Sequence, residues 1–198
     1  MLPPSSVVSR GDAVLVVIDI QQRLAAAMEH AKGVVAATGL LIRAASIAGV
    51  PIVVTRQYPQ GLGDTHPAVE HVLKEAADSG AGVVVVDKTS FDCFAEPAFA
   101  DAVCATGRRQ LVLAGMESHI CVAQTGLIGL REGFDVHVVA DACCSREAYA
   151  HDVAVHRLGA AGAVVTLAES VAYELVGQAG TPEFKRLLAA VKSADAER

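Results

Sequence analysis

The chain of 198 residues has a length typical of one domain that can bury its own hydrophobic core. Its net charge of −6 at neutral pH argues against a nucleic-acid-binding surface, which needs clustered lysine and arginine residues. Apolar residues make up 53% of the chain and aromatic residues only 4%, so aliphatic side chains must form the core. Such a composition favours helices packed on a parallel sheet.

Six short apolar segments are expected to form strands, because continuous valine-rich runs are typical of strands covered on both faces. In chain order they are residues 13–18, 50–55, 82–86, 110–114, 134–140 and 162–166. The intervening segments have helical spacing, most clearly residues 24–48 and 121–131, and a last helix is expected at about 181–193. Alternating strands and helices predict an α/β fold with a parallel sheet and right-handed crossovers.

The five cysteines are odd in number, irregularly spaced and without a C-x-x-C pair, which argues against a disulfide framework or a zinc site. Residues 1–6 lack the features of a signal peptide, and the apolar stretches fall short of the ~20 residues that span a bilayer. Neither a phosphate-binding nor a dinucleotide-binding glycine motif occurs in a suitable context. We therefore expect a cytoplasmic protein with free thiols and without membrane, metal or cofactor.

Chemically useful side chains follow several predicted strands, at the sheet edge where α/β proteins bind ligands. They are Asp19 and Gln21, then Gln57 and Tyr58, then Lys88 and Phe91, and finally Cys121. Cys121 is expected at the start of a helix, where unpaired N–H groups and a nearby Lys88 would lower its pKa. Asp19 could accept the thiol proton, and the helix-terminal N–H groups could bind an oxyanion. This set of groups predicts attack on an acyl carbon.

Structural interpretations remain open for each of these residues taken alone. A buried cysteine is commonly inert, an aspartate after a strand commonly caps a turn, and a lysine is commonly solvated. Cys143 and Cys144 follow the fifth strand, where either could line a pocket, and His119 could pair with Cys121 but is more typical of loop structure. A non-catalytic binding protein and a thiol-redox protein on the same fold are the alternatives.

A resemblance to the isochorismatase-like cysteine hydrolase superfamily is clearest in residues 115–122, Gly-Met-Glu-Ser-His-Ile-Cys-Val. The sequences around Asp19 and Lys88, and residues 141–146, resemble the same superfamily. The resemblance covers about residues 12–170. It implies a three-layer α/β/α fold with a six-stranded parallel sheet in the order 3-2-1-4-5-6, and a catalytic triad of Asp19, Lys88 and Cys121. It also implies a cis peptide bond between Met116 and Glu117, with backbone N–H groups of Glu117 and Cys121 facing the oxyanion, and a homo-oligomer.

Two departures narrow the activity within this superfamily. Nicotinamidases carry metal-binding aspartate and histidine residues after the second strand, and residues 55–63 lack that cluster. Isochorismatases that cleave a vinyl ether commonly lack the cysteine, whereas Cys121 is present. The stretch Gln-Tyr-Pro-Gln-Gly-Leu-Gly resembles the isochorismatase-domain-containing subgroup. We therefore expect a metal-independent hydrolase of a small amide or related acyl compound, with Gln21, Gln57, Tyr58 and Phe91 lining the substrate pocket.

Overall fold

A sheet of six parallel strands forms the centre of the computed structural model, which describes residues 6–197. The strands are β1 (Ala13–Ile18), β2 (Ile52–Gln57), β3 (Val83–Lys88), β4 (Gln110–Met116), β5 (Asp135–Cys144) and β6 (Val164–Thr166). Their order is β3-β2-β1-β4-β5-β6, which confirms the predicted fold class. The first five residues, on which most of the signal-peptide argument depends, lie outside the described part of the chain.

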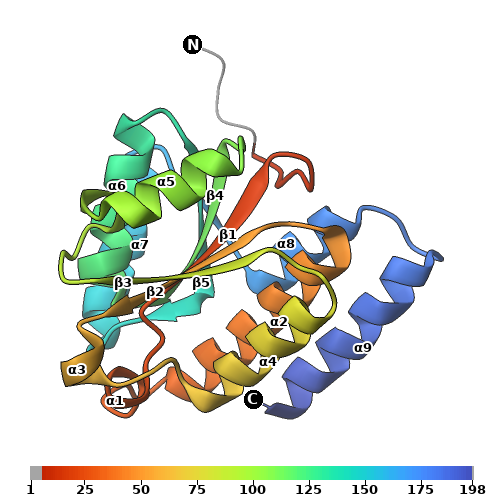
Figure 1. Ribbon diagram of the computed structural model, residues 1–198, viewed down its shortest axis with the longest axis horizontal. Coiled ribbons are helices and arrows are strands. Elements are labelled where there is room, and N and C mark those ends of the chain that lie inside the picture. The colour runs from red at the N-terminus through yellow and green to blue at the C-terminus, as the bar shows by residue number, and fades with distance from the viewer. Residues whose placement is uncertain (1–5, 198) are drawn as a thin grey trace.

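Helices cover both faces of the sheet and give the three layers (Figure 1). They are α1 (Gln22–Ala25), α2 (Ala31–Ala48), α3 (Pro59–Leu62), α4 (Pro67–Asp78), α5 (Pro97–Ala105), α6 (Ala123–Arg131), α7 (Ala148–Ala160), α8 (Ala168–Val176) and α9 (Pro182–Glu197). Helices α2, α4, α8 and α9 form the first helical layer and share the first hydrophobic cluster with one face of the sheet. Helices α5, α6 and α7 form the second helical layer and share the second hydrophobic cluster with the other face of the sheet. Two single turns complete the chain, a 3-10 turn at Cys93–Ala95 and a π-helical turn at Ser118–Val122.

The prediction of a single helix over residues 24–48 is wrong, because α1 ends at Ala25 and α2 begins at Ala31. In the turn between them, the N–H of Met28 donates to the carbonyl of Ala25, and the N–H of Ala31 donates to the carbonyl of Met28. The Met28 side chain is buried in the first cluster. The turn thus buries an apolar side chain, although no proline or glycine in residues 26–30 marks it.

Helix α2 is the central helix of the first layer. By length and composition it is the helix among the described residues that could cross a membrane. Most of its residues are buried, and it packs against α4, α8, α9 and the sheet. Its apolar character is therefore explained by its place in the core. It ends at Gly49, whose left-handed backbone is typical of a helix C-terminus.

Gly115 allows β4 to approach β1 closely beside the site described below. Its φ is +151°, and a Cβ atom there would lie 2.2 Å from the carbonyl oxygen of Ile18. The two residues are register partners at the carboxyl ends of the two central strands. Only glycine fits this position without movement of the backbone. This contact brings the loop after β4 next to the residue that follows β1.

Candidate active site

Asp19 follows β1 and adopts a left-handed backbone conformation with a φ of +53°. Ile18 before it faces the second cluster, so an extended Asp19 would face the opposite side of the sheet. The left-handed turn breaks this alternation, in a region that aspartate enters more readily than most residues. The carboxylate is fully buried, and it accepts hydrogen bonds from Thr55 Oγ1 at Oδ1 and from Lys88 Nζ at Oδ2, both of 2.7 Å.

Lys88 ends β3, two strands away from Asp19, and is only 2% exposed. Its ammonium donates to Asp19 Oδ2 at 2.7 Å, to Gln57 Oε1 at 2.7 Å and to the carbonyl of Ser90 at 3.1 Å. Burial lowers the pKa of Lys88, but the Asp19 carboxylate and the nearby thiols outweigh burial and raise its pKa above the ordinary value. The site therefore contains a buried ion pair of a carboxylate and a fully hydrogen-bonded ammonium.

Cys121 lies in the π-helical turn after β4 and is 5% exposed. Burial raises its pKa, the Asp19 carboxylate raises it further through charge and a hydrogen bond, and Lys88 lowers it by less. The predicted low pKa is therefore wrong, because burial and the carboxylate outweigh the helix start and the lysine. At rest the thiol is neutral and lies beside a base that can accept its proton.

A second thiol lies next to this group. Cys93 is fully buried, and its Sγ lies 3.9 Å from Oγ1 of Thr55, the hydroxyl that bonds Asp19. Burial raises the pKa of Cys93 to about 12, so this thiol is also neutral. The sequence interpretation did not single out Thr55. Its position as the last residue of a predicted strand, at the ligand-binding edge, was the available signal.

The loop after β4 is tied to the segment that ends β5. The peptide bond between Met116 and Glu117 is cis, as the family resemblance implied. Glu117 is buried, and its Oε2 accepts from the backbone N–H of Arg146 at 3.0 Å and from Arg146 Nε at 3.2 Å. His119 Nδ1 lies 2.8 Å from Ser145 Oγ, so this ring nitrogen is engaged with Ser145 and not with Cys121. These contacts fix the backbone that carries Cys121.

Cys143 and Cys144 line a cavity of about 300 Å³ together with His30, which precedes α2, and with residues of α2 and α7, including His151. Asp19, Lys88 and Cys121 are not among the residues that line it. Burial raises the pKa of each of these two thiols to about 12. They are therefore neutral side chains of a neighbouring cavity; Cys143 shares the second hydrophobic cluster with Cys121, whereas Cys144 belongs to the first.

The four residues expected in the substrate pocket fall into two pairs. Gln21 and Gln57 are buried, and their side-chain amides bond to other groups of the protein. Tyr58 and Phe91 are more than half exposed, in the segments that follow β2 and β3. The assignment of all four to substrate stays a prediction, and the two aromatic side chains are the ones free to contact a ligand.

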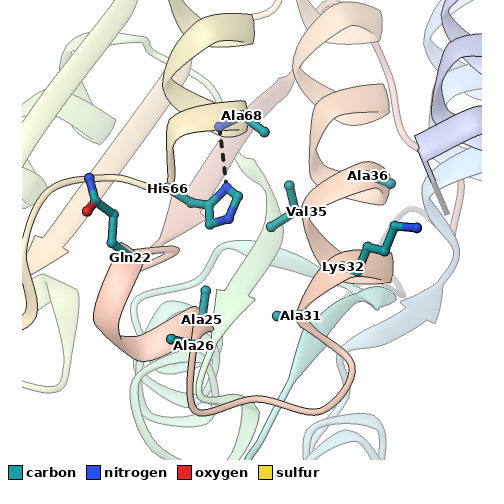
Figure 2. A pocket seen from close by; sticks show the side chains of 9 residues that line it. All are labelled: Gln22, Ala25, Ala26, Ala31, Lys32, Val35, Ala36, His66 and Ala68. Atoms are coloured by element: carbon teal, nitrogen blue, oxygen red, sulfur yellow. Dashed lines mark hydrogen bonds between the residues drawn. The ribbon is translucent and has the colours of Figure 1, made fainter.

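Figure 2 shows another cavity, of about 440 Å³, between α1, α2 and the start of α4. Alanine side chains and Val35 form much of its wall, with His66 and Lys32 as the ionisable groups. Asp19, Lys88 and Cys121 are not among the residues that line this cavity. Within residues 6–197, no group of three or more histidine, cysteine, aspartate or glutamate side chains is placed to hold a metal ion.

Comparison with known proteins identifies the family. Residues 13–170 match the family model described as the Isochorismatase domain. The chain belongs to the isochorismatase family. Members of this family are hydrolases. The chain is 35% identical over 179 residues to isochorismatase domain-containing protein 1 of Salmo salar. The matched region covers 90% of this chain but only 60% of that relative.

Two solved structures are similar to this isochorismatase-family protein over nearly its whole length. The MAR1 ribonuclease from Caenorhabditis elegans is 31% identical, with a TM-score of 0.84 and coverage of 93% of this chain and 92% of that one. YcaC from Pseudomonas aeruginosa, with hexane-2,5-diol and covalent acrylamide, is 27% identical, with a TM-score of 0.80 and coverage of 97% and 96%.

Proposed function

We propose that this protein is a metal-independent cysteine hydrolase that cleaves a small amide or a related acyl compound. The observation that carries the proposal is the convergence of Asp19, Lys88 and Cys121 from the ends of three different strands. All three side chains are buried, yet one is an anion, one a cation and one a nucleophile. Burying an ion pair is expensive unless both partners are well hydrogen-bonded, so its presence beside a thiol favours a chemical role.

In the proposed mechanism, the Asp19 carboxylate takes the proton of the Cys121 thiol as sulfur attacks the acyl carbon. Backbone N–H groups of Glu117 and Cys121 stabilise the oxyanion of the tetrahedral intermediate. Asp19 then gives the proton to the leaving amine, and a thioester on Cys121 remains. A water molecule, deprotonated by Asp19, attacks the thioester, the acid leaves and the proton returns to sulfur. Lys88 stabilises the thiolate by its charge.

The YcaC structure with covalent acrylamide supports this assignment. Acrylamide is a small primary amide and also an electrophile, which reacts with nucleophilic side chains such as thiolates. Because acrylamide reacts at its alkene carbon, the adduct supports a nucleophile on a related fold that holds a molecule of this size. In this chain, Tyr58 and Phe91 provide exposed rings for a small planar ligand.

RNA is a second candidate substrate, because of the similarity to the MAR1 ribonuclease structure. Two observations weigh against it. The chain has a net charge of −6, which repels a phosphate backbone. The guanidinium of Arg56, at the end of β2, is already paired with the carboxylates of Asp87 and Asp64.

The proposal is tested by incubating the purified protein with a panel of small primary amides and measuring ammonia release, with a single-stranded RNA assayed in parallel. Hydrolysis of an amide that is lost in Cys121→Ala supports the assignment. Cleavage of RNA that persists in Cys121→Ala, with no amide hydrolysed, contradicts it.

We also propose that the chain forms homo-oligomers, and the outer edge of β3 supports this. Val84 and Val85 are 45% and 49% exposed in this edge strand. The carbonyls of Gly82 and Lys88 accept hydrogen bonds from the N–H groups of Ile52 in β2 and of Tyr58 just after it, so the backbone groups of residues 83, 85 and 87 face away from the sheet. An apolar edge of this kind is a template for pairing with a second chain.

Sedimentation velocity measures this association. We expect the wild type to sediment as a dimer or a larger assembly, and Val85→Lys to shift it towards the monomer, because a lysine on the edge opposes pairing. Val153→Lys is the matched control, since Val153 is similarly exposed, at 47%, but lies on α7. A monomeric wild type, or equal effects of both substitutions, would overturn this proposal.

A further inference from the structure

The side-chain amide of Gln57 links the lysine of the triad to the protein backbone. Gln57 Oε1 accepts from Lys88 Nζ at 2.7 Å, and Gln57 Nε2 donates to the carbonyl of Thr89 at 2.7 Å. The second bond fixes the orientation of the amide, because its donor end must face a carbonyl. The oxygen end is therefore held towards the ammonium.

A second buried amide holds Gln57 in place. Gln21 Oε1 accepts from the backbone N–H of Gln57 at 2.7 Å. Gln21 Nε2 donates to the carbonyl of Gln57 at 3.0 Å and to the carbonyl of Gly63 at 2.7 Å. Gln21 follows β1, two residues after Asp19, so this pair of amides joins the segments that carry both members of the ion pair.

The arrangement decides how Lys88 can act. Its ammonium has three hydrogens, and Asp19, Gln57 and the carbonyl of Ser90 accept all three. Lys88 is therefore held on Asp19 and affects Cys121 through its charge. Removal of the Gln57 oxygen would leave one hydrogen of a buried ammonium without an acceptor and free the lysine to move.

We infer that Gln57 is a positioning residue of the proposed hydrolase, which holds Lys88 against Asp19 and must do so with an uncharged acceptor. The inference rests on the proposed function. The sequence predicts that Gln57 contacts the substrate; we infer instead that its side chain serves Lys88. A glutamate here would have nearly the same shape but would place a second carboxylate on the ammonium. Because the negative charge of Asp19 already raises the pKa of Cys121, another buried anion would raise it further.

The test compares Gln57→Glu with Gln60→Glu, which adds the same charge three residues away on the exposed surface of α3. The first readout is the pH dependence of Cys121 alkylation by iodoacetamide, followed by peptide mass spectrometry. We expect Gln57→Glu to shift the midpoint upwards by about one pH unit, and Gln60→Glu to leave it unchanged. The second readout is steady-state turnover of a hydrolysed amide, for which we expect Gln57→Glu to lower kcat about tenfold with little change in KM.

Gln57→Met serves as the second variant, because it removes the acceptor without adding charge and keeps the length of the side chain. We expect it to lower kcat by about the same factor while the alkylation midpoint moves by less than in Gln57→Glu. Suppose that Gln57→Glu and Gln57→Met raise KM alone and leave the Cys121 alkylation midpoint unchanged. That result would overturn the inference in favour of substrate binding and leave the proposed function intact. Turnover that survives Cys121→Ala would instead show that the proposed function itself has failed.

Discussion

Replacing Cys121 by alanine is expected to lower the turnover of any amide that the wild type hydrolyses by at least about 10³-fold. The reason is that Cys121 supplies the attacking atom and the covalent intermediate. The neighbouring thiol of Cys93 cannot replace it, because Cys93 is fully buried and out of reach of a substrate. Steady-state ammonia release measures the effect.

Cys104→Ala is the control for this experiment, since Cys104 is the exposed cysteine of α5, within the second layer but outside the site. We expect it to leave turnover unchanged. If Cys121→Ala keeps more than a tenth of wild-type turnover, the sulfur is not the nucleophile. Equal losses in both variants would point to damaged folding and not to chemistry, which circular dichroism of each variant distinguishes.

Replacing Lys88 by methionine is expected to cost about 3–5 kcal/mol of unfolding free energy, because it leaves a buried carboxylate without its ionic partner. Asp19 has no exposure to solvent, and the side-chain donors left to it would be neutral, the Thr55 hydroxyl and the Cys121 thiol. Urea denaturation at pH 7 measures the loss. The pKa of Lys88 is raised in the folded state, so its contribution is fully present below its ordinary pKa of 10.5 and is lost only above it.

The double variant Asp19→Asn/Lys88→Met separates charge from packing. It removes both charges, so we expect it to be more stable than Lys88→Met alone, although neither variant should turn over substrate. A double variant that is no more stable than the single one would show that the unpaired carboxylate is not the cause of the loss.

Most of the fold was predictable because its signals are local and strong. The valine-rich runs mark strands covered on both faces, and their alternation with helical segments leaves few topologies. The strand order came from the family resemblance and not from the pattern of apolar residues. The turn at residues 26–30 was not predictable from local sequence, since it is set by the burial of Met28 in a core made by distant segments.

Asp19, Lys88 and Cys121 could be placed at one sheet edge from their types and positions in the sequence, but their electrostatics could not be predicted. Cys121 does lie in the first turn after β4, yet its pKa is raised, because burial and Asp19 act through the folded structure. The hydrogen-bond partners of Thr55, Gln21 and Gln57 were likewise not predictable from the sequence. Their types suit substrate binding as well as internal bonding, and only the three-dimensional contacts show which groups they bond.

The most direct measurement is the pH dependence of iodoacetamide labelling at each of the five cysteines, in the wild type and in Asp19→Asn. The account predicts that Cys121 is labelled faster than Cys93, Cys143 and Cys144, because it is the most exposed of these four thiols and the one that the site uses as nucleophile. It also predicts that Asp19→Asn moves the Cys121 midpoint to lower pH, because the carboxylate raises the pKa of this thiol. An unreactive Cys121, or a midpoint that Asp19→Asn leaves unchanged, would contradict a triad in which Asp19 controls the thiol.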